Sequence, residues 1–94
     1  MPKIDVKTET DSPRGWTFAV SVSEGSQQRE YQVTLNWSDY DHWSHGRVAP
    51  QKVAAAVVAY ALDQGGLAEL GERFDCARIR RRWPQADHEL PKRF

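Results

Sequence analysis

Two histidines and two carboxylates crowd into segment 37–47 and could together hold a metal ion. They are Asp39, Asp41, His42 and His45. Zinc and other divalent ions accept imidazole nitrogens and carboxylate oxygens, and a site needs three or four such ligands that converge. A His-x-x-His pair in a loop has no fixed facing geometry, and no second cluster supplies further ligands. We therefore keep these four residues as candidates for a divalent-metal site and otherwise expect no metal and no cofactor.

The same segment holds Trp37, Tyr40 and Trp43, three aromatic side chains that could form a contact surface for another protein. Aromatic residues carry much of the binding energy at protein interfaces. In the alternative, segment 37–47 is a structured crossing between a strand and a helix, and Trp37 and Trp43 pack on the core. No glycine-flanked elbow presents a serine, so nothing here indicates a hydrolase, and we expect no enzymatic activity.

Four arginines near the C-terminus form the other candidate binding surface. They are Arg78, Arg80, Arg81 and Arg82. In a helix, all of these except Arg80 lie opposite the apolar face of Ile79 and Trp83, which predicts a solvated face. The alternative is an anionic partner, either nucleic acid or an acidic protein surface. No signature of an RNA-recognition, KH or zinc-finger module supports the nucleic-acid version.

Cys76 begins the same predicted helix, where a lowered pKa could make a thiol nucleophilic. Asp75 beside it opposes formation of the thiolate, and Cys76 shares the apolar spacing of Ile79. We expect a buried structural thiol, since free cysteines are often core residues.

The elements that must position these residues begin with strands. Apolar and polar side chains alternate in three stretches, residues 3–8, 16–23 and 31–37. Period-two alternation with short polar connections predicts a three-stranded antiparallel meander over 3–37, with one apolar face. In the first strand the alternation places Ile4, Val6 and Thr8 on one face.

An apolar segment with helical spacing follows the meander. Pro50 suits the first helical position and Gly65-Gly66 ends the segment, which predicts a main helix over 50–63 across the apolar face. The apolar arc covers roughly 200° at about 100° per residue, more than one sheet face can cover. Either the following residues wrap this helix, or a second copy of the chain does. We expect short helices within 67–83 and a loose tail over 85–94, in which one turn could form near Asp87–Leu90.

The sequence thus predicts a single α+β domain over residues 1–94: a three-stranded antiparallel β-meander packed on one main α-helix, followed by one or two short C-terminal helices. The chain has 13 Lys+Arg and 13 Asp+Glu, which excludes a globally basic nucleic-acid coat and an acidic tail protein. The charge is polarised, because residues 1–46 carry four basic against seven acidic side chains and residues 47–94 carry nine against six.

No apolar run approaches the roughly 18 residues of a membrane span, so we expect no membrane partner. The first residues lack the apolar core of a signal peptide. Together with a single cysteine, these features predict a reduced, cytoplasmic protein.

Residues 31–84 contain strand residues, a proline-initiated apolar helix and a final tryptophan–proline pair. The positions that define this pattern are Tyr31, Val33, Leu35, Pro50, Phe74, Asp75, Ile79, Arg81, Trp83 and Pro84. The pattern resembles that of small uncharacterised bacterial proteins with a strand-then-helix order. The resemblance implies a bacterial origin and this order of elements, and it brings no activity, cofactor or catalytic residue.

Size, composition and the lack of a catalytic motif favour a small non-catalytic module that binds protein. Its partner would be either another protein or a second copy of the chain, in which case the module is a homodimer. Its contact residues would be Trp37, Tyr40, Trp43 and the arginine surface. The first alternative is a nucleic-acid-binding accessory protein that uses the C-terminal arginines, whose affinity would fall steeply with salt. The second is a divalent-metal-binding protein at residues 39–45.

Overall fold

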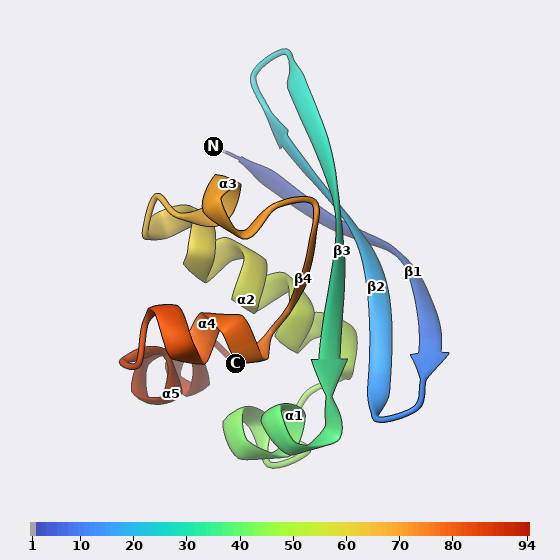
Figure 1. Cartoon of the computed structure of the whole chain (residues 1–94), viewed down its shortest axis with the longest axis vertical. Coiled ribbons are helices and arrows are strands. Elements are labelled where there is room, and N and C mark those ends of the chain that lie inside the picture. Colours follow the sequence, from blue (N-terminus) through green and yellow to red (C-terminus); the bar gives the residue numbers. More distant parts are fainter. Residues whose placement is uncertain (1) are drawn as a thin grey trace.

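The computed structural model of the chain describes residues 2–94 and contains one sheet with a layer of helices against it (Figure 1). The strands are β1 (Lys3–Ser12), β2 (Gly15–Glu24), β3 (Gln27–Asn36) and β4 (Arg73–Asp75). The helices are α1 (Trp37–Ser44), α2 (Pro50–Asp63), α3 (Leu67–Leu70), α4 (Ala77–Arg82), α5 (Ala86–Glu89) and the 3₁₀ helix η1 (Leu90–Arg93). In this part of the chain, no helix has the length and apolar character needed to cross a membrane.

The α+β class and the antiparallel meander are confirmed, because β1, β2 and β3 pair in that order with antiparallel ladders. The sheet also has a fourth strand, β4, which pairs in parallel with β3. The short helices predicted within 67–83 are present as α3 and α4, but the strand Arg73–Asp75 between them was not predicted. This strand inserts Phe74 into the core, where its ring lies edge-on to Tyr31 with centroids 6.5 Å apart.

β1 departs from the predicted alternation at Lys7. The pairing with β2 shifts by one residue between Val6 and Thr8, so Lys7 is an extra residue in β1. A bulge of this kind turns the following side chains to the other face. Thr8 therefore does not share the face of Ile4 and Val6, as the alternation predicts. The Lys7 ammonium instead reaches Glu30 at 3.2 Å.

The main helix α2 lies across the apolar face of the sheet with the predicted bounds (Figure 1). Its six buried residues are Val53, Ala54, Val57, Val58, Tyr60 and Ala61. The C-terminal elements cover the side that the sheet leaves free, since Trp83 packs edge-on to Tyr60 with ring centroids 6.3 Å apart. A Cβ on Gly66 would collide with the same Trp83 ring. The apolar surface of α2 is thus covered within the chain.

The segment predicted as a loose tail is structured. It forms α5 and η1, and Ala86 and Leu90 are fully buried. The two residues are four apart, which places both on one face of a helical turn. This spacing anchors the end of the chain on the core.

Candidate functional site

Segment 37–47 starts with helix α1 rather than with a loop. Asn36 caps the helix: its side-chain oxygen accepts from the Asp39 backbone N–H at 2.8 Å, and its amide nitrogen donates to the Asp39 carboxylate at 3.2 Å. The helix ends at His45, which adopts a left-handed conformation with φ of 52°. Because Asp39 and Trp43 are four residues apart, both face inward toward the C-terminal helices.

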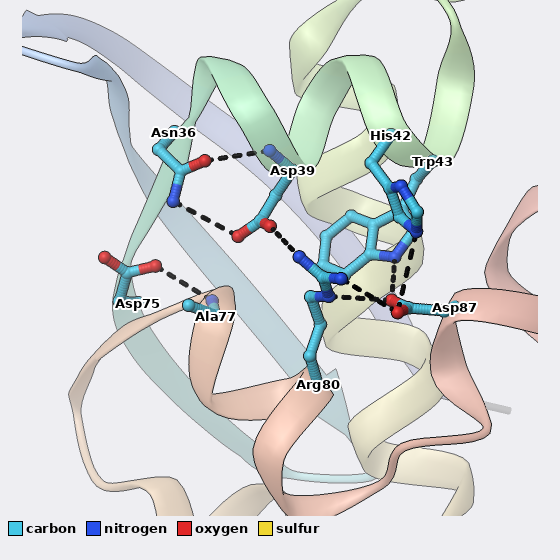
Figure 2. Close-up of polar contacts among 8 residues, drawn as sticks. All are labelled: Asn36, Asp39, His42, Trp43, Asp75, Ala77, Arg80 and Asp87. Carbon is cyan, nitrogen blue, oxygen red and sulfur yellow. Dashed lines mark hydrogen bonds and ion pairs between the residues drawn. The ribbon is translucent and has the colours of Figure 1, made fainter.

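Arg80, on α4, lies between two carboxylates from other helices (Figure 2). Its guanidinium donates to Asp39 on α1 at 2.8 Å and forms a two-point contact with Asp87 on α5 at 2.8 and 2.9 Å. The Trp43 indole N–H donates to the same Asp87 at 2.8 Å. We call these four residues the interhelical cluster. It joins three helices through charge-assisted hydrogen bonds.

The pKa values in the interhelical cluster follow from these contacts. Partial burial by itself raises the pKa of Asp87, but hydrogen bonds from Arg80 and Trp43 and the charge of Arg80 outweigh it, so the pKa is lowered from its ordinary value. Hydrogen bonds to Asp87 and to Asp39 raise the pKa of Arg80. The contacts therefore stabilise the charged forms of Arg80 and Asp87.

The Asp87 contacts predict a pH dependence of stability. A carboxyl group whose pKa is lower in the folded state adds stability above its unfolded pKa, and this stability is lost as pH falls through the folded value. We expect wild-type stability to fall below about pH 4, near the ordinary pKa of Asp. Asp87→Asn should flatten that part of the curve. Urea unfolding between about pH 2.5 and 6 measures this, and equal slopes for both proteins would contradict it.

The structure separates the four metal candidates. Asp39 is turned into the interhelical cluster, whereas Asp41 and His45 are exposed to solvent. The His42 imidazole lies 3.5 Å from the Asp87 carboxylate. Within residues 2–94, no group of three or more His, Cys, Asp or Glu side chains is placed to hold a metal ion. The structure therefore offers no support for the metal interpretation.

The remaining arginines of the C-terminal surface differ in their contacts. Arg78 donates to a backbone carbonyl of α3 at 3.0 Å. Arg82 pairs with Glu69 at 3.3 Å, and its guanidinium lies 5.0 Å from the centre of the Trp83 ring. Arg81 is exposed and makes no ion pair with the described residues. Contacts inside the chain thus occupy all of these arginines but one.

Trp37 is the one large apolar side chain that residues 2–94 expose to solvent, with 60% of its surface accessible. Its ring packs on Trp16 with centroids 4.6 Å apart and edge-on to Tyr40 at 6.2 Å. The Trp37 backbone N–H donates to the Arg14 carbonyl at 2.8 Å, which ties the start of α1 to the turn before β2. We call Trp16, Trp37 and Tyr40 the aromatic surface. The sequence predicts Trp37 and Tyr40 as contact residues, but it predicts Trp16 only as a residue of a strand.

Trp43 and Cys76 lie in the core. Trp43 is fully buried, so its predicted role as a partner-contact residue is wrong: the helix turns it inward, and Asp87 accepts its N–H. Cys76 is buried as predicted. Burial and the neighbouring Asp75 charge raise the pKa of its thiol well above the ordinary value, which disfavours the reactive thiolate.

Comparisons of the chain with family models, with curated proteins and with solved structures find no match.

Proposed function

We propose that the protein is a non-catalytic, cytoplasmic protein-binding module whose contact surface is centred on Trp37. The observation that carries the proposal is the exposed indole, 60% accessible and packed on Trp16 and Tyr40. Tryptophan is enriched among the residues that dominate protein interfaces. A side chain that neighbouring rings already hold loses little freedom on binding, so more of its contact energy contributes to affinity.

The surroundings of Trp37 also suit a protein partner. A hollow of about 410 Å³ adjoins the indole and is lined by Arg14, Asn36 and Ser38 among others. A second hollow of about 460 Å³ shares Arg14 and Asn36 with the first and extends toward Asp75. An aromatic anchor bordered by arginine and small polar groups has the composition of an interface centre with a polar rim.

The test replaces Trp37 with alanine. Proteins that cross-link to the wild-type chain in cells are purified, and a second copy of the chain is included among them. Calorimetry then measures the affinity of each of these proteins for the chain. We expect at least one to bind wild type and to bind Trp37→Ala at least about 30-fold more weakly, the effect of losing a dominant interface residue. Gln51→Ala, at an exposed position on α2 outside both candidate surfaces, is the control and should retain affinity.

Two outcomes would overturn the proposal. One is that the purified partners bind wild type and Trp37→Ala equally well. The other is salt-sensitive binding of a labelled oligonucleotide that Arg81→Ala weakens and Trp37→Ala leaves intact. That result would favour the nucleic-acid alternative, because phosphate contacts make affinity depend on salt.

A further inference from the structure

One half of β3 has a free edge. β4 pairs with β3 only from Gln32 onward, where the Gln32 N–H donates to the Glu72 carbonyl at 2.7 Å. Backbone groups of alternate residues point to the same edge of a strand. The N–H and C=O groups of Gln28 and Glu30 therefore point to this edge, where no strand of the described chain pairs with them.

Two hollows run along this free edge, between β3 and α3. Both are lined by Arg29, Tyr31 and Ala68. The first, of about 250 Å³, is closed on its inner side by the apolar residues Val22, Leu62 and Leu67. The second, of about 320 Å³, reaches Gly71 and Glu72. We call the two hollows together with the free edge the β3 groove.

The opposite edge of the sheet, formed by β1, is protected against pairing with a further strand, and the β3 edge is not. β1 carries the bulge at Lys7, and bulges and lysines are devices that prevent further strand pairing at an edge. The β2–β3 register runs without a shift from Gly15↔Asn36 to Glu24↔Gln27. The free half of β3 is thus a regular strand, able to pair with another extended segment.

We propose that the β3 groove binds an extended peptide segment of another protein by strand addition. In this mode backbone hydrogen bonds supply affinity and alternate side-chain positions supply specificity. Every second side chain of the added strand would share the face of Tyr31 and pack against Leu67 and Ala68 on α3. These positions call for apolar residues.

Acidic residues at the two ends of the groove call for basic residues near the ends of the ligand. Glu24, Glu30 and Glu72 line the groove against a single cation, Arg29. Lys7 pairs with Glu30 at 3.2 Å from the β1 side, which leaves Glu24 and Glu72 as the acidic ends of the groove. Opposite charges on facing strands are favourable. The fitting ligand therefore has apolar residues at alternate positions and lysine or arginine near its ends.

The β3 groove and the aromatic surface lie at opposite ends of β3. The groove borders the first half of the strand, beside α3, whereas Trp37 follows its last residue. In Figure 1, α3 lies beside the upper part of β3 and α1 lies at its lower end. The two sites can be tested separately, so a negative result for one site does not contradict the proposal for the other.

The experiment selects binders from a displayed library of random heptapeptides on the wild-type chain. We expect the selected sequences to have apolar residues at alternate positions and lysine or arginine near their ends. In synthetic versions, N-methylation of every second backbone nitrogen should abolish binding, and methylation of the nitrogens between them should not. Only ladder pairing along one edge produces this periodicity.

Protein variants locate the peptide. Ala68→Trp fills the groove and should weaken binding at least about tenfold, whereas Gln51→Trp, exposed on α2, should not. Glu72→Lys should weaken it about twofold to fivefold, and Glu9→Lys, exposed on β1, should leave it unchanged. Trp37→Ala should also leave it unchanged.

The proposal is overturned if no peptide is selected, if N-methylation shows no alternation, or if Ala68→Trp and Gln51→Trp bind alike. Loss of binding in Trp37→Ala would place the peptide on the aromatic surface and would overturn it as well.

Discussion

Replacing Arg80 with alanine is expected to lower the free energy of unfolding by about 3 kcal/mol. The change leaves the carboxylates of Asp39 and Asp87 without the cation that lies between them, and the Asp39 side chain is only 4% exposed. Stranding a buried charge costs far more than losing a surface ion pair, which contributes about 0–1 kcal/mol. Because the Arg80 side chain is itself 37% exposed, we take the lower end of the range for buried pairs. Urea unfolding followed by tryptophan fluorescence measures the loss.

Arg81→Ala is the matched control for this prediction. Arg81 is an exposed neighbour on the same helix, and its removal should change stability by no more than about 0.5 kcal/mol. The double variant Arg80→Ala/Asp39→Asn should be less destabilised than the sum of its single variants, since the unpaired charge is then gone. Equal losses in Arg80→Ala and Arg81→Ala would show that the interhelical cluster contributes no more than a surface contact.

Replacing Trp43 with alanine is expected to cost about 4 kcal/mol of unfolding free energy. The side chain is fully buried, so its removal leaves a cavity among α1 and the C-terminal helices. It also removes the indole donor to Asp87. Such a loss is a large share of the roughly 5–15 kcal/mol that stabilise a small domain.

Two further tryptophan variants separate packing from hydrogen bonding. Trp43→Phe keeps an aromatic ring and should cost about 1–3 kcal/mol, for the lost N–H donor to Asp87 and the space left by the smaller ring. Trp37→Ala removes a side chain that is 60% exposed, and we expect it to cost under about 1 kcal/mol. If Trp37→Ala were as destabilising as Trp43→Ala, Trp37 would be a structural residue, and the proposed contact surface would lose its support.

The strand β2 and the helix α2 were predictable because the apolar residues of each recur at the spacing of a strand or of a helix. β2 alternates without interruption from Trp16 to Val22, and all four apolar residues of that alternation are buried, although Ser21 between two of them is buried as well. The helix α2 has a proline at its start and an apolar arc along its length. Both signals are local, so a single sequence contains them.

β4 was missed because three residues cannot establish a period. Arg73 and Asp75 are polar and Phe74 alone faces the core, so the strand exists through its pairing with β3. At the end of the chain the sequence indicates no more than one turn, for another reason: Ala86 and Leu90 have helical spacing, but the polar residues around them dominate the composition.

The candidate site was predictable where it depends on neighbours in sequence. The helix α1 is not among the predicted elements, although Asn36 and Asp39 have the spacing of a helix start, a signal that is present in the sequence. The contact between Arg80 and Asp39 has no such signal, because the two residues are 41 positions apart in the chain. The helical wheel does separate Arg80 from the other three arginines, yet it cannot identify what Arg80 binds.

The parallel pairing of β3 with β4 has a consequence for the order of folding. The three strands of the meander are joined by short turns and can pair early, since closing short loops loses little chain entropy. β4 reaches Gln32 only after residues 33–72 have been arranged around the core. We therefore expect the meander and α2 to form first and the C-terminal third of the molecule to dock last. The same order means that brief opening of the native protein would begin at β4, α4 and α5 and release the interhelical cluster before the meander.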